Sequence, residues 1–179
     1  MGEVVGEETA KLAGPGAKVL LLAPAKGDPV GLWIEPVLQA FTAALKQHGN
    51  GIVAATERVK ARTDDPSPTR EELTAAQLEG LLDKAGGVTT LVSFVGFPVL
   101  DEAQIATLKK RQIKSVAIYT AGPQAGPHYK KLLEARALDL AILPRMEPPA
   151  AAQKPTTPKE IFNHQFFTVT ATNAAQLNF

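Results

Sequence analysis

The feature that most constrains the fold of this sequence is a regular alternation of short apolar runs with longer amphipathic or polar segments. Five such runs recur at roughly 30-residue spacing. We expect them to be strands near residues 18–23, 52–56, 89–95, 115–119 and 140–143. Strands that alternate with helices are joined by crossovers and therefore lie parallel. The sequence thus predicts an α/β protein, a three-layer α/β/α sandwich around a mostly parallel five-stranded sheet.

Right-handed crossovers limit the order of these strands. The commonest solution is the Rossmann-like, flavodoxin-like order 2-1-3-4-5. Helix boundaries are also marked. Because Pro36 discourages helix at Glu35, we expect a long first loop and a helix from Pro36, which ends at Gly49 in a left-handed cap. Thr69 and Glu72 form a capping-box pattern that opens the next helix, and Asp101 caps the one after it.

The composition changes at both ends of the chain. Residues 1–16 are rich in Gly and Glu with weak periodicity, which predicts a flexible arm, and residues 17–143 form the sandwich domain. Residues 144–159 are rich in proline and predict an extended strap. Within residues 160–179, apolar and polar side chains alternate from 165 to 171, as in a strand. We expect this sixth strand to join an edge of the same sheet; the alternative is that it pairs with another chain and forms an oligomer.

Charge and residue types exclude several classes of partner and cofactor. Nineteen basic and eighteen acidic residues give a net charge of +1, which predicts no nucleic-acid partner. Since there is no cysteine, thiolate metal sites and thiol nucleophiles are excluded, and the three histidines show no metal-ligand spacing. We expect no metal and no cofactor. No apolar run is long enough for membrane insertion, and no signal peptide is visible; the protein is therefore either cytoplasmic or exported with its signal peptide removed.

Motifs of well-known doubly wound enzymes are missing. There is no G-x-G-x-x-G after the first strand and no G-x-S-x-G anywhere in the chain. The first loop also lacks the hydroxyl side chains with which a flavodoxin holds its flavin phosphate. Ligands of open parallel sheets bind where the strands end, at their carboxyl edge, and four loops of the predicted sheet lie there.

The best candidate among these loops is the segment Tyr119–Lys131, which holds two Gly-Pro breaks and a histidine at the start of a helix. Free backbone N–H groups at such a helix start can hold an anion. The candidate ligand-binding residues, from this loop and the first one, are Lys26, Trp33, Thr120, Gly122, Gln124, Gly126 and His128. The alternative is a plain strand-to-helix turn in which His128 faces water.

The run VTTLVSFVGFPVLDEAQIATLKKRQIKSVAIYTAG, residues 88–122, resembles one lobe of a type I periplasmic-binding protein. The likeness lies in an apolar strand, a small-residue loop, a short helix and a second buried strand. It implies a binding domain of the same fold, although those receptors close two lobes on their ligand and this chain has length for one.

Two functional hypotheses follow. The first is a non-catalytic domain that binds a small molecule or a protein partner. The second is an enzyme acting on a small anionic substrate at the carboxyl edge, with His128 as acid or base and Lys26 binding the anion.

Overall fold

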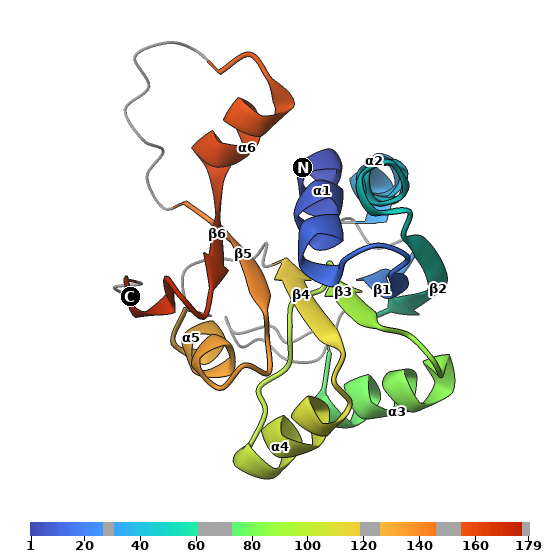
Figure 1. Cartoon of the computed structure of the whole chain (residues 1–179), viewed down its shortest axis with the longest axis vertical. Helices are drawn as coiled ribbons and strands as arrows, with labels where there is room; N and C mark the ends of the chain where they lie inside the picture. Colours follow the sequence, from blue (N-terminus) through green and yellow to red (C-terminus); the bar gives the residue numbers. More distant parts are fainter. Residues whose placement is uncertain (27–30, 61–72, 119–125, 146–154, 177–179) are drawn as a thin grey trace.

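The computed structural model of the chain describes residues 1–26, 31–60, 73–118, 126–145 and 155–176. Its centre is a six-stranded sheet in the order β2-β1-β3-β4-β5-β6 (Figure 1). The strands are β1 (Lys18–Pro24), β2 (Ile52–Val59), β3 (Thr90–Ser93), β4 (Lys114–Ile118), β5 (Leu140–Pro144) and β6 (Phe166–Thr170). The first five pair in parallel, and β6 pairs antiparallel with β5. This confirms the predicted fold class, the strand order and the added C-terminal strand.

Helices cover both faces of the sheet (Figure 1). They are α1 (Gly2–Ala13), α2 (Gly31–Gly49), α3 (Ala75–Ala85), α4 (Glu102–Lys110), α5 (Gly126–Glu134) and α6 (Pro158–Gln165), followed by a 3-10 turn, η2 (Ala174–Gln176). Alternate residues of a strand point to opposite faces. Leu20 and Leu22 of β1 therefore join the core under α3, α4 and α5, while Val19 and Leu21 join the core under α1, α2 and α6.

The segment that we expected to be a flexible arm differs in the structure, because residues 2–13 form helix α1 packed against α2. The glycines of α1, which led us to expect a flexible arm, lie where α1 contacts α2. A Cβ on Gly2 would meet the carbonyl oxygen of Val37 at 2.0 Å, and one on Gly6 would meet that of Phe41 at 2.6 Å. Glycine lowers the intrinsic helix propensity, but here it permits a close approach of two helices.

Helix α2 starts earlier than predicted, and the expected long first loop is correspondingly shorter. The helix begins at Gly31 and contains Pro36. Proline lacks an N–H and disturbs a helix interior. As the sixth residue of α2, Pro36 lies beyond the first four N–H groups that have no helical partner, so it removes one hydrogen bond from a helix of 19 residues. At the other end, Asn50 rather than Gly49 takes the left-handed conformation, with φ 50°.

Helix α3 corrects another boundary. The expected capping residues Thr69 and Glu72 lie outside the described residues, and the helix begins at Ala75. Its capping box is made by Thr74 and Gln77: the Gln77 N–H donates to the Thr74 hydroxyl at 3.2 Å, and the Thr74 N–H donates to the Gln77 side chain at 2.9 Å. The same motif thus occurs five residues later. In α4, by contrast, Asp101 caps the helix as predicted.

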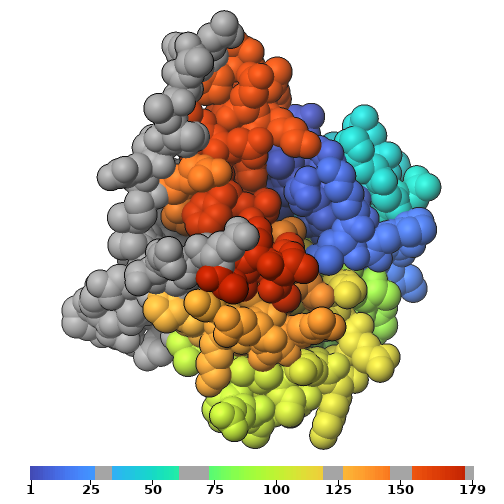
Figure 2. Space-filling model, turned by 60° about the vertical axis from the view of Figure 1, so that its left-hand side comes forward, coloured from blue at the N-terminus to red at the C-terminus, as the bar shows by residue number. Residues whose placement is uncertain are grey.

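The C-terminal segment docks on the same domain, and Figure 2 shows its residues, in red, lying against the rest of the molecule. Thr168 of β6 pairs with Ile142 of β5, as we expected for a strand near 165–171. Helix α6 before it was not predicted, although Thr157 and Glu160 form a capping box with Pro158 at the first helical position. Most of the proline-rich strap, residues 146–154, lies outside the described part of the chain. No described helix has both the length and the hydropathy needed to cross a membrane.

Candidate functional site

The candidate site lies at the carboxyl edge of the sheet, where the parallel strands end. Lys26 follows β1 at this edge and is exposed. His128 is the third residue of α5, the helix that follows β4 in the chain. Because β1, β3 and β4 are parallel neighbours, both residues belong to the same edge. The order of the strands therefore places at one edge of the sheet two parts of the chain that are about a hundred residues apart.

The loop after β3 is folded by its own side chains. The Ser93 hydroxyl donates to the carbonyl of Gly96, and the N–H of Val95 points back to the same hydroxyl. Gly96 has φ 79°, a conformation that glycine adopts without strain. The N–H of Phe94 continues the sheet by donating to Leu22 of β1 at 2.8 Å. These bonds shorten β3 to four residues and give the loop a fixed course.

Two side chains of α5 tie this loop to the helix. The N–H of Phe97 donates to the hydroxyl of Tyr129 at 2.9 Å, and the carbonyl of Phe97 lies 3.2 Å from Nε2 of His128. A carbonyl can only accept, so Nε2 carries the proton. Tyr129 is only 1% exposed, and its ring meets the ring of His128 edge to face at 5.4 Å. Both backbone groups of Phe97 are therefore held by two neighbouring residues of α5.

His128 is thus half-buried and hydrogen-bonded. It does not simply face water, as the plain-turn alternative held. A histidine whose Nε2–H is held by a main-chain carbonyl keeps a fixed ring orientation. Such an orientation suits a group that positions a ligand or a loop.

A second contact holds the beginning of α2 at this edge. Arg58 at the end of β2 forms an ion pair with Glu35 of α2 at 2.7 Å, and its Nη1 donates to the carbonyl of Pro24 at 3.1 Å. One guanidinium therefore joins α2, β1 and β2. Sequence reasoning did not find this pair, because the two residues lie in separate elements and no spacing rule connects them.

The structure describes two of the other predicted site residues. Gly126 is the first residue of α5, and Trp33 lies in the first turn of α2. Thr120, Gly122 and Gln124 lie outside the described residues, as does Tyr119. Across the described ranges, no group of three His, Asp or Glu side chains is arranged to hold a metal ion.

Comparison with known sequences gives no match. No protein-family model matches the chain, and no curated protein matches its sequence.

Comparison with solved structures shows a clear likeness of fold. A sugar-binding protein of a sugar ABC transporter from Bacillus halodurans has TM-score 0.59 at 12% identity, over 99% of this chain and 62% of that one. A periplasmic solute-binding protein of an ABC transporter from Actinobacillus succinogenes, with bound D-allose, has TM-score 0.58 at 10% identity, over 98% and 60%. The XylFII–LytSN complex gives 0.57 at 11%, over 96% and 59%.

These likenesses confirm the fold-level resemblance to type I periplasmic-binding proteins. The chain spans between 47% and 62% of the length of these and similar chains. At such low identity the likeness shows the fold alone.

Proposed function

We propose that this chain is a non-catalytic binding domain that holds a small polar molecule at the carboxyl edge of its sheet. The observation that carries the proposal is the double hydrogen bond between the β3 loop and α5, through Phe97, His128 and Tyr129. It fixes one side of the edge before any ligand arrives, and a pre-organised site loses less entropy on binding.

The proposed contact residues are Lys26, Trp33, Thr120, Gly122, Gln124, Gly126 and His128. A protonated Nε2 held by a main-chain carbonyl is poorly placed to take a proton from a substrate through that nitrogen. This favours a binding role for His128 over an acid or base role.

The ligand class that we propose is a neutral monosaccharide. Support comes from the fold, since a similar solved protein contains D-allose and another is described as a sugar-binding protein. A single domain leaves one side of its ligand open to water, whereas tight sites enclose most of the ligand surface. We therefore expect weak binding by the isolated chain.

The test is calorimetric titration with neutral monosaccharides, including D-fructose and D-allose, together with the shift of the melting temperature. A sugar that binds should raise the melting temperature of the chain, and His128→Ala should weaken its binding about tenfold or more. Lys131→Ala is the control, because Lys131 is exposed on the same helix. Binding that survives His128→Ala unchanged would contradict the site, and binding of no sugar at all would contradict the ligand class.

A further inference from the structure

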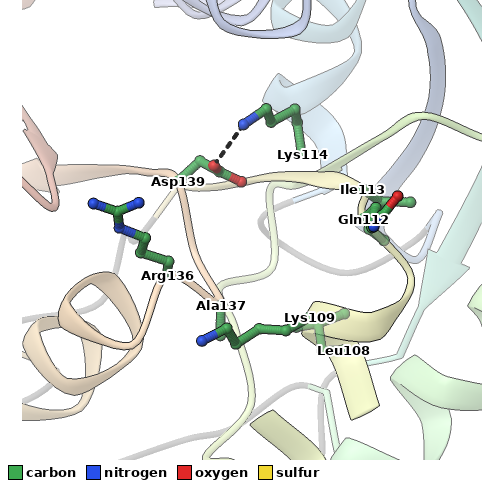
Figure 3. A pocket seen from close by; sticks show the side chains of 8 residues that line it. All are labelled: Leu108, Lys109, Gln112, Ile113, Lys114, Arg136, Ala137 and Asp139. Atoms are coloured by element: carbon green, nitrogen blue, oxygen red, sulfur yellow. Dashed lines mark hydrogen bonds and ion pairs between the residues drawn. The ribbon is translucent and has the colours of Figure 1, made fainter. Parts of the chain in front are cut away.

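A hollow of the molecule lies at the amino edge of the sheet, opposite the candidate site. It has a volume of about 280 Å³ and is bounded by the end of α4, the start of β4 and the turn between α5 and β5 (Figure 3). Leu108, Ile113 and Ala137 supply apolar surface. Leu108 and Ala137 are buried, so they form part of a stable floor rather than a mobile surface.

Basic side chains dominate the rim of this hollow. Lys109, Lys114 and Arg136 line it, with Asp139 as its one acidic residue. Both oxygens of Asp139 are engaged: Oδ1 lies 3.1 Å from Nζ of Lys114, and Oδ2 accepts from the N–H of Ser115 at 2.9 Å. Within the described part of the chain, Lys109 and Arg136 have no ion-pair partner. The hollow therefore has an uncompensated positive charge.

The helix dipoles do not account for all of these cations. A lysine in the last turn of a helix is favoured by the free carbonyls there, and this applies equally to Lys109 and Lys110 of α4. It does not apply to Lys114, which starts a strand. After α5, the N–H groups of Arg136 and Ala137 already bond the last helical carbonyls, those of Leu133 and Leu132.

The backbone gives independent support for a function of the rim. Gln112 and Arg136 both line the hollow, and both have a left-handed backbone, with φ 54° and 55°. This conformation is strained for a non-glycine residue, and glycine is the usual choice just after the end of a helix. Helices α1 and α3 are instead followed directly by glycine, at Gly14 and Gly86. Asn50 after α2 is also left-handed, but asparagine adopts this conformation more readily than arginine or glutamine.

The two helices that border the hollow thus end in residues with long polar side chains in place of glycine. Figure 3 shows Lys109 of α4 and Arg136, on the turn after α5, among the side chains that line the hollow. A strained backbone that carries a polar side chain into a hollow is a common mark of a binding site.

We propose that this hollow binds a small phosphate monoester. An arginine guanidinium matches two oxygens of a phosphoryl group, and lysine ammonium groups supply point charges beside it. The apolar floor would receive the organic part of the molecule. This site is separate from the carboxyl edge, so the two ends of the sheet take ligands of different charge.

The test is calorimetric titration of the full chain with inorganic phosphate and with glycerol 3-phosphate at low salt. We expect both to bind, the ester more tightly because of the floor. Arg136→Gly should weaken binding about tenfold or more, whereas the melting temperature should stay the same or rise because glycine relieves the left-handed strain. A merely structural role of Arg136 would not separate affinity from stability in this way.

Lys109→Ala should also weaken the binding of both compounds. Lys110→Ala is the matched control, since it removes the same charge from the same helix without changing the lining of the hollow. If Lys109→Ala and Lys110→Ala lost equal affinity, the phosphate compounds would be attracted by the positive charge of the whole helix end and not by the hollow, which would overturn the proposal. So would binding of neither compound at millimolar concentration, or binding only to vesicles that contain phosphatidic acid.

Discussion

Asn173 closes the outer edge of β6 by forming hydrogen bonds with both backbone groups of Thr170, its N–H and its C=O. Its Oδ1 accepts from the N–H of Thr170 at 2.7 Å, and its own N–H donates to the carbonyl of Thr170 at 3.2 Å. Its Nδ2 also donates to the carbonyl of Thr168 at 3.2 Å. The backbone and side chain of Asn173 together therefore take the place that a neighbouring strand would have.

The start of β6 is closed in a similar way. The N–H of Phe166 donates to the carbonyl of Phe162 in α6, and the carbonyl of Phe166 accepts from Nε of Arg145 at 3.2 Å. An edge strand with free N–H and C=O groups attracts other strands. These contacts remove most of that attraction and favour docking within one chain over assembly through β6.

We predict that Asn173→Ala will open this edge. The loss of the two hydrogen bonds from the Asn173 side chain to backbone groups should lower the free energy of unfolding by about 1 kcal/mol. The exposed strand should also self-associate, which light scattering coupled to size-exclusion chromatography would detect as a mass that rises with concentration.

The control for this variant is Thr172→Ala, because among the described residues the hydroxyl of Thr172 bonds to a side chain, that of Thr170, and not to the backbone of the strand. It should remain as stable and as monodisperse as the original chain. If Asn173→Ala had the same free energy of unfolding and the same mass as the original chain, Asn173 would not be what protects the edge of β6.

Deletion of residues 160–179 should lower the melting temperature at every protein concentration. The segment contains Phe162 and Val169, which are 2% and 1% exposed, and burial of such side chains is worth about 1.5–3 kcal/mol each. Differential scanning calorimetry at several concentrations measures the effect. Phe162→Ala should reproduce part of it, by loss of its stacking on Phe166 at 5.5 Å. A truncated chain that melts like the full chain but loses self-association would show instead that the strand serves a partner.

The sheet could be predicted from the sequence because each buried strand is a local apolar run with turn residues on both sides. Helix α1 could not, because its signal is not local. Gly2 and Gly6 favour this helix only because they allow α1 to approach the backbone of α2 at Val37 and Phe41. Composition shows such glycines only as helix breakers.

The candidate site was predictable only in part. The carboxyl edge follows from parallel strands, so the placement of Lys26 and His128 needed no more than strand order. The bond from His128 to the carbonyl of Phe97 involves backbone 31 residues away. A pattern of side chains in the sequence does not show which backbone carbonyl will accept a hydrogen bond. It also does not show that the backbone of Arg136 is left-handed.

Glu160 should titrate below its ordinary range. The N–H of Thr156, followed by that of Thr157, donates to this carboxylate and lowers the pKa of Glu160. A lowered pKa in the folded state means that the stabilisation exists above the unfolded pKa and is lost as the pH falls through the folded pKa. Acid should therefore loosen the first turn of α6.

Carbon-detected NMR of the Glu160 carboxyl, with the amide shifts of Thr156 and Thr157, measures this titration. Both amides should move with the same midpoint as the carboxyl. In Glu160→Gln, the two amide shifts should no longer follow this acid transition. A midpoint at the ordinary value for glutamate would contradict the capping role.

The contact between α1 and α2 leads to a prediction about the sign of a mutational effect. Gly→Ala in the interior of a helix normally stabilises it, by up to about 1 kcal/mol. At Gly6 the new Cβ would lie 2.6 Å from the carbonyl oxygen of Phe41 and 2.8 Å from Cβ of Ala44. Neither atom belongs to a flexible side-chain end, so α1 would have to move away from α2, and overpacking of this kind costs about 1–3 kcal/mol.

Gly6→Ala should therefore lower the free energy of unfolding, measured by urea denaturation. Gly80→Ala in α3 is the matched control, since a Cβ there meets no atom within 4 Å, and this variant should gain stability. The same chemical change is thus expected to have opposite signs at two helix positions, because one glycine lies in a helix contact and the other faces open space. A gain in both variants would mean that α1 does not pack closely on α2 in solution.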